Sequence, residues 1–164
     1  MALFNKHSLE MRETQFSCGF VIYRIDPCKN LDDEQWSKDN LQILLLQLPS
    51  GRYDFPKGKI EMNETFIETA YRELEEETGI NKDDIIRDEQ FQYQTTYFPY
   101  DPSIKRKVEK RLMMFLGMLK KGRECRKVTE HTGFKWVNWK IPADIQKPNI
   151  DSTLEYVENY WNLI

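Results

Sequence analysis

The sequence predicts an α/β protein in which a mixed β-sheet lies between helices. Strand-like and helix-like segments alternate along the chain, which is the pattern of layered α/β folds. Residues 41–48 form a dense apolar run, typical of a strand buried on both faces, and residues 65–78 have the apolar period of a helix. A chain of 164 residues with 40% hydrophobic residues fits one domain with a substantial core.

The strands can be placed from runs of β-branched, aromatic and other apolar residues between turn signals. We expect strands at residues 16–25, 41–48, 51–55, 91–97, 111–119 and 134–139. Polar loops are expected at 26–40 and 98–110. Ser152 and Glu155 have the spacing of a capping box, which would open a C-terminal helix with Leu154, Val157 and Trp161 facing inward.

The helix at 65–78 follows a loop that Pro56 and Gly58 mark. Thr65 and Asn63 are both suitable N-cap residues, and Gly79 stands where a C-cap glycine belongs. One stripe should be buried because its apolar residues recur at i, i+3, i+4 and i+7. These residues are Ile67, Ala70, Tyr71 and Leu74.

The C-terminal half of this helix concentrates negative charge. From Glu73 to Glu77, four of five residues are glutamate, although carboxylates near a helix C-terminus oppose its macrodipole. Glu73, Glu76 and Glu77 share one face through their i, i+3, i+4 spacing. Such oxygen ligands suit a hard divalent cation, and the alternative is a solvated acidic face. Arg72 can pair with Glu64 or with one of these glutamates and fix its rotamer, and the alternative is a surface ion pair.

The spacing around these glutamates resembles the signature of the Nudix hydrolases. Its fixed positions here are Gly58, Glu64, Arg72, Glu73, Leu74, Glu76, Glu77, Gly79 and Ile80. The resemblance implies an α/β/α sandwich and an enzyme that hydrolyses a nucleoside diphosphate linked to another group, with Mg²⁺ or Mn²⁺ as cofactor. Residues 1–164 are then expected to form a single Nudix domain, with 1–15 as a poorly ordered extension.

Four further segments resemble the asymmetrical diadenosine tetraphosphate hydrolases of that family. They are residues 18–24, 41–47, 53–61 and 130–137. This resemblance implies cleavage of diadenosine tetraphosphate to ATP and AMP. Diphosphoinositol polyphosphates and RNA caps remain alternative substrates, because their hydrolases share the Pro-Lys-Gly sequence at 56–58. A Nudix-fold binding module without turnover is a further alternative, which the intact set of glutamates disfavours.

The resemblance also implies roles for individual residues. The metal ligands would be Glu73, Glu76, Glu77, Glu130 and the backbone carbonyl of Lys57. Glu76, Glu77, Glu130 and Arg72 would be the catalytic residues. Glu130 would be either a further ligand or the base that activates the attacking water. The alternative without a function is an exposed glutamate in a solvated loop. A cation is needed because the negative charges of the carboxylates and of the polyphosphate repel each other.

Substrate contacts would come from aromatic faces and from cations. Tyr97 and Phe134 are expected to stack on the two purines, with Phe134 standing where the family has a tyrosine. Lys57, Lys105 and Lys107 are expected to contact the polyphosphate. Lys105 and Lys107 belong to a basic cluster that could instead be a solvated loop, and Phe134 could instead be a core residue.

Composition excludes several other classes of protein. A net charge of −3 argues against a general nucleic-acid binder, and no apolar run reaches the length of a membrane span. The N-terminal residues lack the apolar stretch of a secretory signal, and an odd count of three cysteines suggests free thiols. We therefore expect a cytoplasmic monomer whose partner is a small nucleotide.

Overall fold

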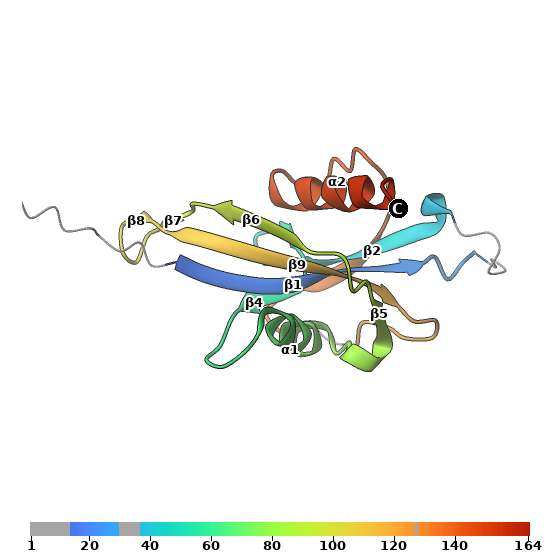
Figure 1. The fold of residues 1–164 in the computed structure, drawn as a ribbon, viewed down its shortest axis with the longest axis horizontal. Coiled ribbons are helices and arrows are strands. Elements are labelled where there is room, and N and C mark those ends of the chain that lie inside the picture. The colour runs from blue at the N-terminus through green and yellow to red at the C-terminus, as the bar shows by residue number, and fades with distance from the viewer. Residues whose placement is uncertain (1–13, 30–36, 127) are drawn as a thin grey trace, which may run out of the picture.

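The computed structural model describes residues 14–29, 37–126 and 128–164. An eight-stranded mixed sheet has the order β10-β2-β1-β9-β5, with β3 beside β2, β4 beside β1 and β6 beside β9. Helix α1 (Phe66–Thr78) covers one face of this sheet and helix α2 (Asn149–Trp161) covers the other (Figure 1). The predicted mixed sheet between helices, an α/β/α sandwich, is confirmed.

The bounds of the strands follow the predicted pattern closely. The main sheet contains β1 (Thr14–Ile25), β2 (Leu41–Gln47), β3 (Tyr53–Asp54), β4 (Lys57–Lys59), β5 (Ile85–Arg87), β6 (Tyr93–Tyr97), β9 (Glu109–Leu119) and β10 (Gly133–Asn138). A separate hairpin pairs β7 (Tyr100–Asp101) with β8 (Arg106–Lys107). Short 3-10 turns lie at Lys38–Asn40 and Lys82–Asp84.

Strand β1 organises the sheet because different neighbours share its length. It runs parallel to β9, pairs with β2 near Ile25 and pairs with β4 near Gly19. The β3–β4 segment therefore lies between β1 and β2 at one end of the sheet. The approach is close, since a Cβ atom on Gly19 would lie 2.2 Å from the carbonyl oxygen of Pro56. This packing fixes the start of β4, directly above helix α1.

Each face of the sheet has its own hydrophobic core. The core against α2 includes Val21, Ile43, Leu45, Met114, Leu116, Leu154 and Val157. The core against α1 includes Phe20, Ile22, Leu44, Leu46, Ala70, Leu74 and Phe115. Strands buried on both faces explain the unbroken apolar run of β2. Ala70 and Leu74 are fully buried, and Ile67 and Tyr71 pack against the same core, so the predicted helical stripe is confirmed.

Helix α1 begins and ends at the predicted signals. Thr65 is the N-cap, and together with Glu68 it forms a capping box. Asn63, the other candidate, instead has a positive φ of 67° in the preceding turn. Gly79 ends the helix in the left-handed conformation, with φ 72°.

Several features of the secondary structure differ from the predictions. Strand β4 (Lys57–Lys59) was not predicted and includes Gly58, which was expected to mark a loop. The expected loop at 98–110 contains the β7–β8 hairpin, and β9 already begins at Glu109. Strand β5 was not predicted, because a three-residue edge strand is too short to show a period. The capping box at Ser152 does not form: α2 begins at Asn149, and the N-cap Pro148 makes no side-chain hydrogen bond.

A buried carboxylate explains the earlier start of α2. The side chain of Asp151, in the first turn, accepts hydrogen bonds from the backbone N–H groups of Ile145 and Gln146 at 3.0 Å each. Leu154 and Val157 are buried and Trp161 packs against the same core, so the predicted inward face is confirmed. Within the described residues no helix is long and apolar enough to cross a membrane. Most of the extension expected at 1–15 lies outside the described residues.

Candidate active site

The glutamates of α1 pack against the main chain at the start of β4. Gly58 has no side chain, and a Cβ atom there would lie 2.1 Å from the Glu73 carboxylate carbon. Any other residue at position 58 would therefore displace the Glu73 carboxylate. Burial is the largest cause that raises the pKa of Glu73, and the charges of Glu76 and Glu130 raise it further.

Glu77 is the most enclosed of the acids. Its exposed fraction is 6%, and its Oε2 atom accepts the backbone N–H of Lys57 at 3.0 Å. Burial raises the pKa of Glu77 to about 8, and the nearby charge of Glu73 adds to this effect. A carboxylate held in this way gains strongly from a cation beside it, because the cation would favour the charged form.

Arg72 joins the predicted acids into one network. Its guanidinium donates to Glu64 at 2.6 and 3.0 Å, to Glu73 at 2.8 Å and to Glu76 at 3.2 Å. A further hydrogen bond of 2.9 Å reaches the carbonyl oxygen of Lys59 in β4. The hydrogen bond from Arg72 is the largest cause that lowers the pKa of Glu64, to about 2. Both pairings expected for Arg72 are therefore present together.

Glu130 lies on the loop before β10, and this loop is anchored beside the Arg72 network. The neighbouring Thr129 hydroxyl donates to the carbonyl oxygen of Glu76 at 3.4 Å, and Thr132 donates its backbone N–H to Gln47 at 2.8 Å. These two contacts anchor the loop to α1 and to β2. Glu130 is exposed, and its charge acts on the pKa of Glu73. The structure thus places Glu76, Glu77 and Glu130 within electrostatic range of Glu73.

The donor atoms at this place suit a hard cation. As they stand, no three His, Cys, Asp or Glu side chains in the described part of the chain are arranged to hold a metal ion. In this arrangement the guanidinium of Arg72 pairs with both Glu73 and Glu76. The chemistry still fits a divalent cation, since every expected donor is a carboxylate or carbonyl oxygen and Gly58 leaves the space that Glu73 needs.

Lys57 links the acids to the opposite side of the sheet. Its cross-strand partner is Gly19, so its side chain points toward the α2 face while its N–H group is bound by Glu77. The ammonium pairs with Asp54 at 2.7 Å. Burial lowers the pKa of Lys57, but Asp54, Tyr97 and Glu77 together raise it above its ordinary value. Tyr97 therefore lies within electrostatic range of Lys57.

The two aromatic residues expected at the substrate lie on opposite faces of the sheet. Tyr97 packs against the core beneath α2. Phe134 pairs with Leu46 across the sheet, so it faces the α1 side and is 39% exposed there. Phe134 is therefore not a buried core residue, and it shares the face that carries the glutamates.

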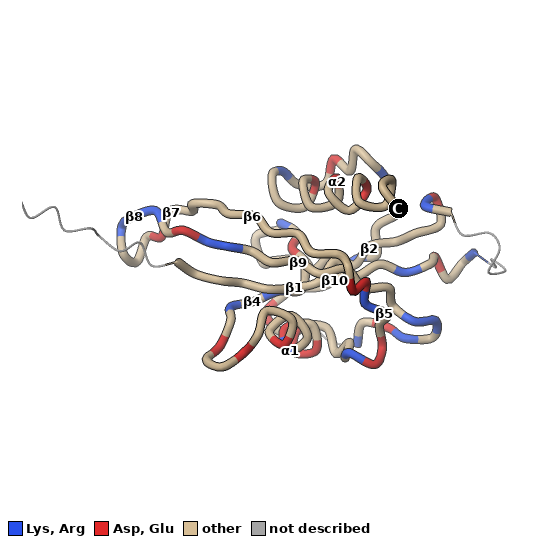
Figure 2. The backbone as a smooth tube through the Cα atoms, viewed as in Figure 1, with Lys and Arg blue, Asp and Glu red and all other residues tan. Residues whose placement is uncertain are grey.

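The two cations expected along the polyphosphate lie apart from the glutamates. Lys105 is in the turn of the β7–β8 hairpin and Lys107 is in β8, and both are exposed. Figure 2 shows the cations of this hairpin at one end of the molecule and the acids gathered on α1. The structure therefore does not bring Lys105 and Lys107 together with Glu73, Glu76 and Glu77.

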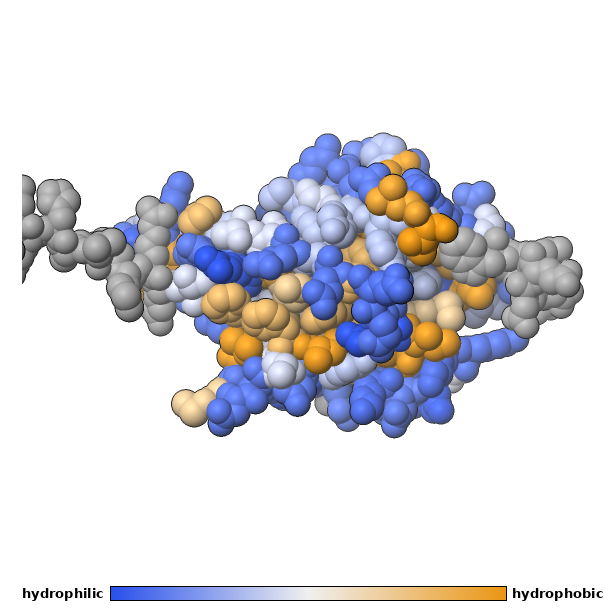
Figure 3. Space-filling model, in the orientation of Figure 1, coloured by the Kyte–Doolittle hydropathy of each residue, from blue (hydrophilic) through white to orange (hydrophobic). Residues whose placement is uncertain are grey.

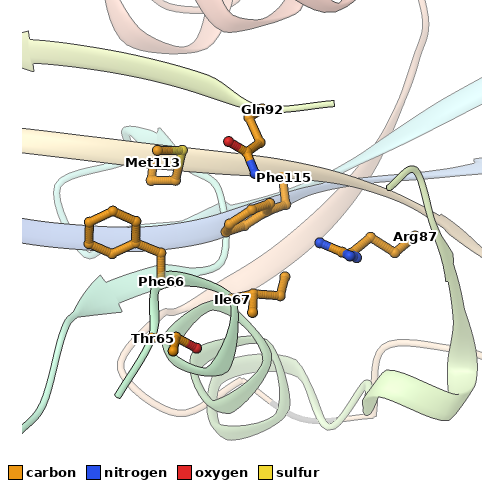
Figure 4. A pocket seen from close by; sticks show the side chains of 7 residues that line it. All are labelled: Thr65, Phe66, Ile67, Arg87, Gln92, Met113 and Phe115. Atoms are coloured by element: carbon orange, nitrogen blue, oxygen red, sulfur yellow. The ribbon is translucent and has the colours of Figure 1, made fainter. Parts of the chain in front are cut away.

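A cavity of about 260 Å³ lies elsewhere, at the N-terminal end of α1. Its lining residues are Thr65, Phe66, Ile67, Arg87, Gln92, Met113 and Phe115 (Figure 4). Apolar side chains gather around it, between the sheet and α1 (Figure 3). It contains none of the glutamates, so it is separate from the candidate active site.

Two polar residues of the site were not predicted. Asp54 lies beside Lys57, and the only signal for it was a charged residue inside an expected short strand. His131 follows Glu130 on the loop before β10. Burial lowers the pKa of His131, with Asp54 and Glu130 opposing this effect, and its Nδ1 atom is buried without a hydrogen-bond partner in the described structure.

Comparisons with known proteins identify the family of this chain. The family model of the NUDIX domain matches residues 35–155, more than half of the chain. The asymmetrical bis(5'-nucleosyl)-tetraphosphatase of Rattus norvegicus is 31% identical over 124 residues, which cover 74% of this chain and 77% of that protein. The Mus musculus protein of the same name is 29% identical over the same shares of the two chains.

A solved structure gives the same fold at lower identity. The Ap4A hydrolase of C. elegans, as a binary complex, superimposes with a TM-score of 0.71 at 21% identity, covering 92% of this chain and 99% of that one. The matched family model spans the whole helix of glutamates, the loop before it and Glu130. The chain therefore belongs to the Nudix hydrolase family.

Proposed function

We propose that this Nudix hydrolase cleaves dinucleoside polyphosphates, with diadenosine tetraphosphate giving ATP and AMP, and that it requires Mg²⁺ or Mn²⁺. The observation that carries the proposal is the packing of the Glu73 and Glu77 carboxylates onto Gly58 and the N–H group of Lys57. The choice of substrate is supported by the 31% identity to a bis(5'-nucleosyl)-tetraphosphatase. RNA caps and diphosphoinositol polyphosphates remain the alternatives.

The residues of the site would have separate roles in binding the cation and activating water. Glu73, Glu76, Glu77, Glu130 and the Lys57 carbonyl would hold the cation. The bound cation would neutralise phosphate charge and orient water. Arg72 keeps Glu73 and Glu76 in position through hydrogen bonds of 2.8 and 3.2 Å. Glu130, on its anchored loop, would accept a proton from the attacking water or serve as a further ligand.

Substrate contacts would come from both sides of β4. Lys57 would donate to a phosphate oxygen, and Tyr97, within electrostatic range of it, would stack on one base. Phe134, exposed on the face of the glutamates, would stack on the other base. Lys105 and Lys107 would then contact only a part of the substrate that extends toward the hairpin.

A cytoplasmic monomer remains part of this proposal. Cys18 and Cys28 are thiols, which accords with a reducing compartment. Sedimentation of the purified protein would test its oligomeric state, and fractionation of cells would test its location.

A substrate panel tests the function directly. Diadenosine tetraphosphate, a capped RNA and a diphosphoinositol polyphosphate would be compared at saturating Mg²⁺, with products separated by chromatography. We expect the highest kcat/KM for the dinucleotide, equal amounts of ATP and AMP, and ¹⁸O from labelled water in AMP. Formation of two ADP, or a preference for either other substrate, would refute the proposal.

A further inference from the structure

Asp54 is held rigidly beside the only lysine that touches the glutamate cluster within the described structure. Its Oδ2 atom pairs with the Lys57 ammonium at 2.7 Å, and its Oδ1 atom accepts the N–H group of Phe55 at 2.9 Å. The side chains are 23% and 19% exposed, so the pair is largely shielded from solvent. Both carboxylate oxygens are therefore occupied, and the position of the Asp54 charge is fixed.

Lys57 is fixed as firmly as its partner. Its backbone N–H is bound by Glu77, and its Cβ atom lies only 2.4 Å from where a side chain on Gly19 would begin. A lysine ammonium has three N–H donors, of which Asp54 takes one. Lys57 can therefore still donate to a phosphate oxygen, but the two side chains together bring no net charge.

Phosphate groups differ in the charge that they present to such a pair. A phosphate bridged on both sides carries one negative charge, whereas a terminal phosphate carries about −1.5 to −2 near neutral pH. All phosphates of a dinucleoside polyphosphate are bridged. A nucleoside polyphosphate such as ATP ends in a terminal phosphate. Bound beside Lys57, this group would be repelled by Asp54, whose charge also acts on Glu77.

We propose that Asp54, by neutralising Lys57, makes this site select bridged phosphates over terminal ones. The inference rests on the proposed function and adds a consequence for turnover. The product ATP has a terminal phosphate that the dinucleotide lacks, so the Asp54–Lys57 pair weakens product binding relative to substrate binding. The selectivity arises because the Asp54 carboxylate repels the additional charge of a terminal phosphate. Such repulsion commonly separates two ligands whose attractive contacts with a protein are alike.

The test compares two substrates with the same number of phosphates. Diadenosine tetraphosphate and adenosine 5'-tetraphosphate are assayed with wild type and Asp54→Asn, which keeps an acceptor for the Phe55 N–H group. In Asp54→Asn, the ratio of kcat/KM for adenosine tetraphosphate to kcat/KM for diadenosine tetraphosphate should rise by roughly 3- to 30-fold. This is the scale of one charge at close range in a medium of high effective dielectric constant. Inhibition by ATP should become stronger by a similar factor.

Two further variants separate charge from structure. Asp39→Asn removes an exposed acid on a 3-10 turn elsewhere in the fold and should leave the ratio unchanged. In a Lys57→Gln background, Asp54→Asn should no longer shift the ratio. Asp54→Ser, which also keeps a hydroxyl acceptor, replaces Asp54→Asn if that variant unfolds.

The outcomes distinguish this inference from the proposed function. If wild type cleaves the dinucleotide and Asp54→Asn leaves the ratio and ATP inhibition unchanged, the role of Asp54 is refuted while the function stands. A shift that persists with Gln at position 57 also overturns the inference, because Asp54 would then act without Lys57. If wild type does not cleave the dinucleotide, the proposed function fails, and binding of ATP to the two proteins still tests Asp54.

Discussion

Replacement of Glu77 by glutamine should raise the stability of the metal-free protein while it destroys activity. Glu77 is 6% exposed, and burial raises its pKa from an ordinary value of 4.5 to about 8. The folded protein therefore binds a proton at this site between about pH 4.5 and pH 8, where the unfolded chain does not. The free energy of unfolding must fall as pH rises through this window, because the folded state binds more protons than the unfolded state.

The size of the effect follows from the two pKa values. Each pKa unit corresponds to ~1.4 kcal/mol, so Glu77 lowers stability by on the order of a few kcal/mol above pH 8. Glutamine is similar in shape to the protonated acid, and its Oε1 atom can still accept the Lys57 N–H group. Wild type and Glu77→Gln should therefore unfold at similar temperatures at pH 5. At pH 8.5 the variant should melt roughly 5–15 °C higher.

Thermal unfolding in chelator at both pH values measures this difference. Glu76→Gln is the matched control, because it makes the same change at a side chain that is 58% exposed, and its melting temperature should stay close to that of wild type at both pH values. Both variants should lose several orders of magnitude in turnover at saturating magnesium. Added Mg²⁺ should raise the melting temperature of wild type and have little effect on Glu77→Gln.

Two results would refute this reasoning. A Glu77→Gln variant with the wild-type pH dependence of stability would show that Glu77 is not held as a buried acid. Wild-type activity in either glutamine variant would remove the substituted residue from the set of metal ligands.

Three further predictions concern the rest of the site. Gly58→Ala should displace the Glu73 carboxylate, weaken Mg²⁺ binding in calorimetry and lower stability by about 1–3 kcal/mol, and normal Mg²⁺ affinity would contradict the close packing. Glu130→Gln should lower kcat more than it raises KM, and a change in KM alone would make Glu130 a binding residue. Tyr97→Ala and Phe134→Ala should each weaken binding of a non-hydrolysable dinucleotide by about 1–3 kcal/mol, and unchanged affinity would exclude stacking.

The sequence alone determined the fold class, the glutamate helix and its caps. These features are local: the stripe from Ile67 to Leu74, the N-cap Thr65 and the C-cap Gly79 depend on neighbours within a few turns of the chain. The same reasoning failed where distant contacts set the boundary. Helix α2 begins before Ser152 because Asp151 accepts hydrogen bonds from two backbone N–H groups of the preceding loop. The short segment β5 is a strand because it pairs with β9.

The arrangement of the site around β4 depends on contacts between segments that are distant in the sequence. The close approach of β1 to the β3–β4 segment places Lys57 between Glu77 and Asp54, which no spacing in the sequence reveals. Pairing within the sheet likewise places Tyr97 and Phe134 on opposite faces. Lys107 lies on a separate hairpin because β8 pairs with β7. The face that a strand residue occupies depends on its partner in the sheet, and a register is fixed by burial over the whole fold rather than by local sequence.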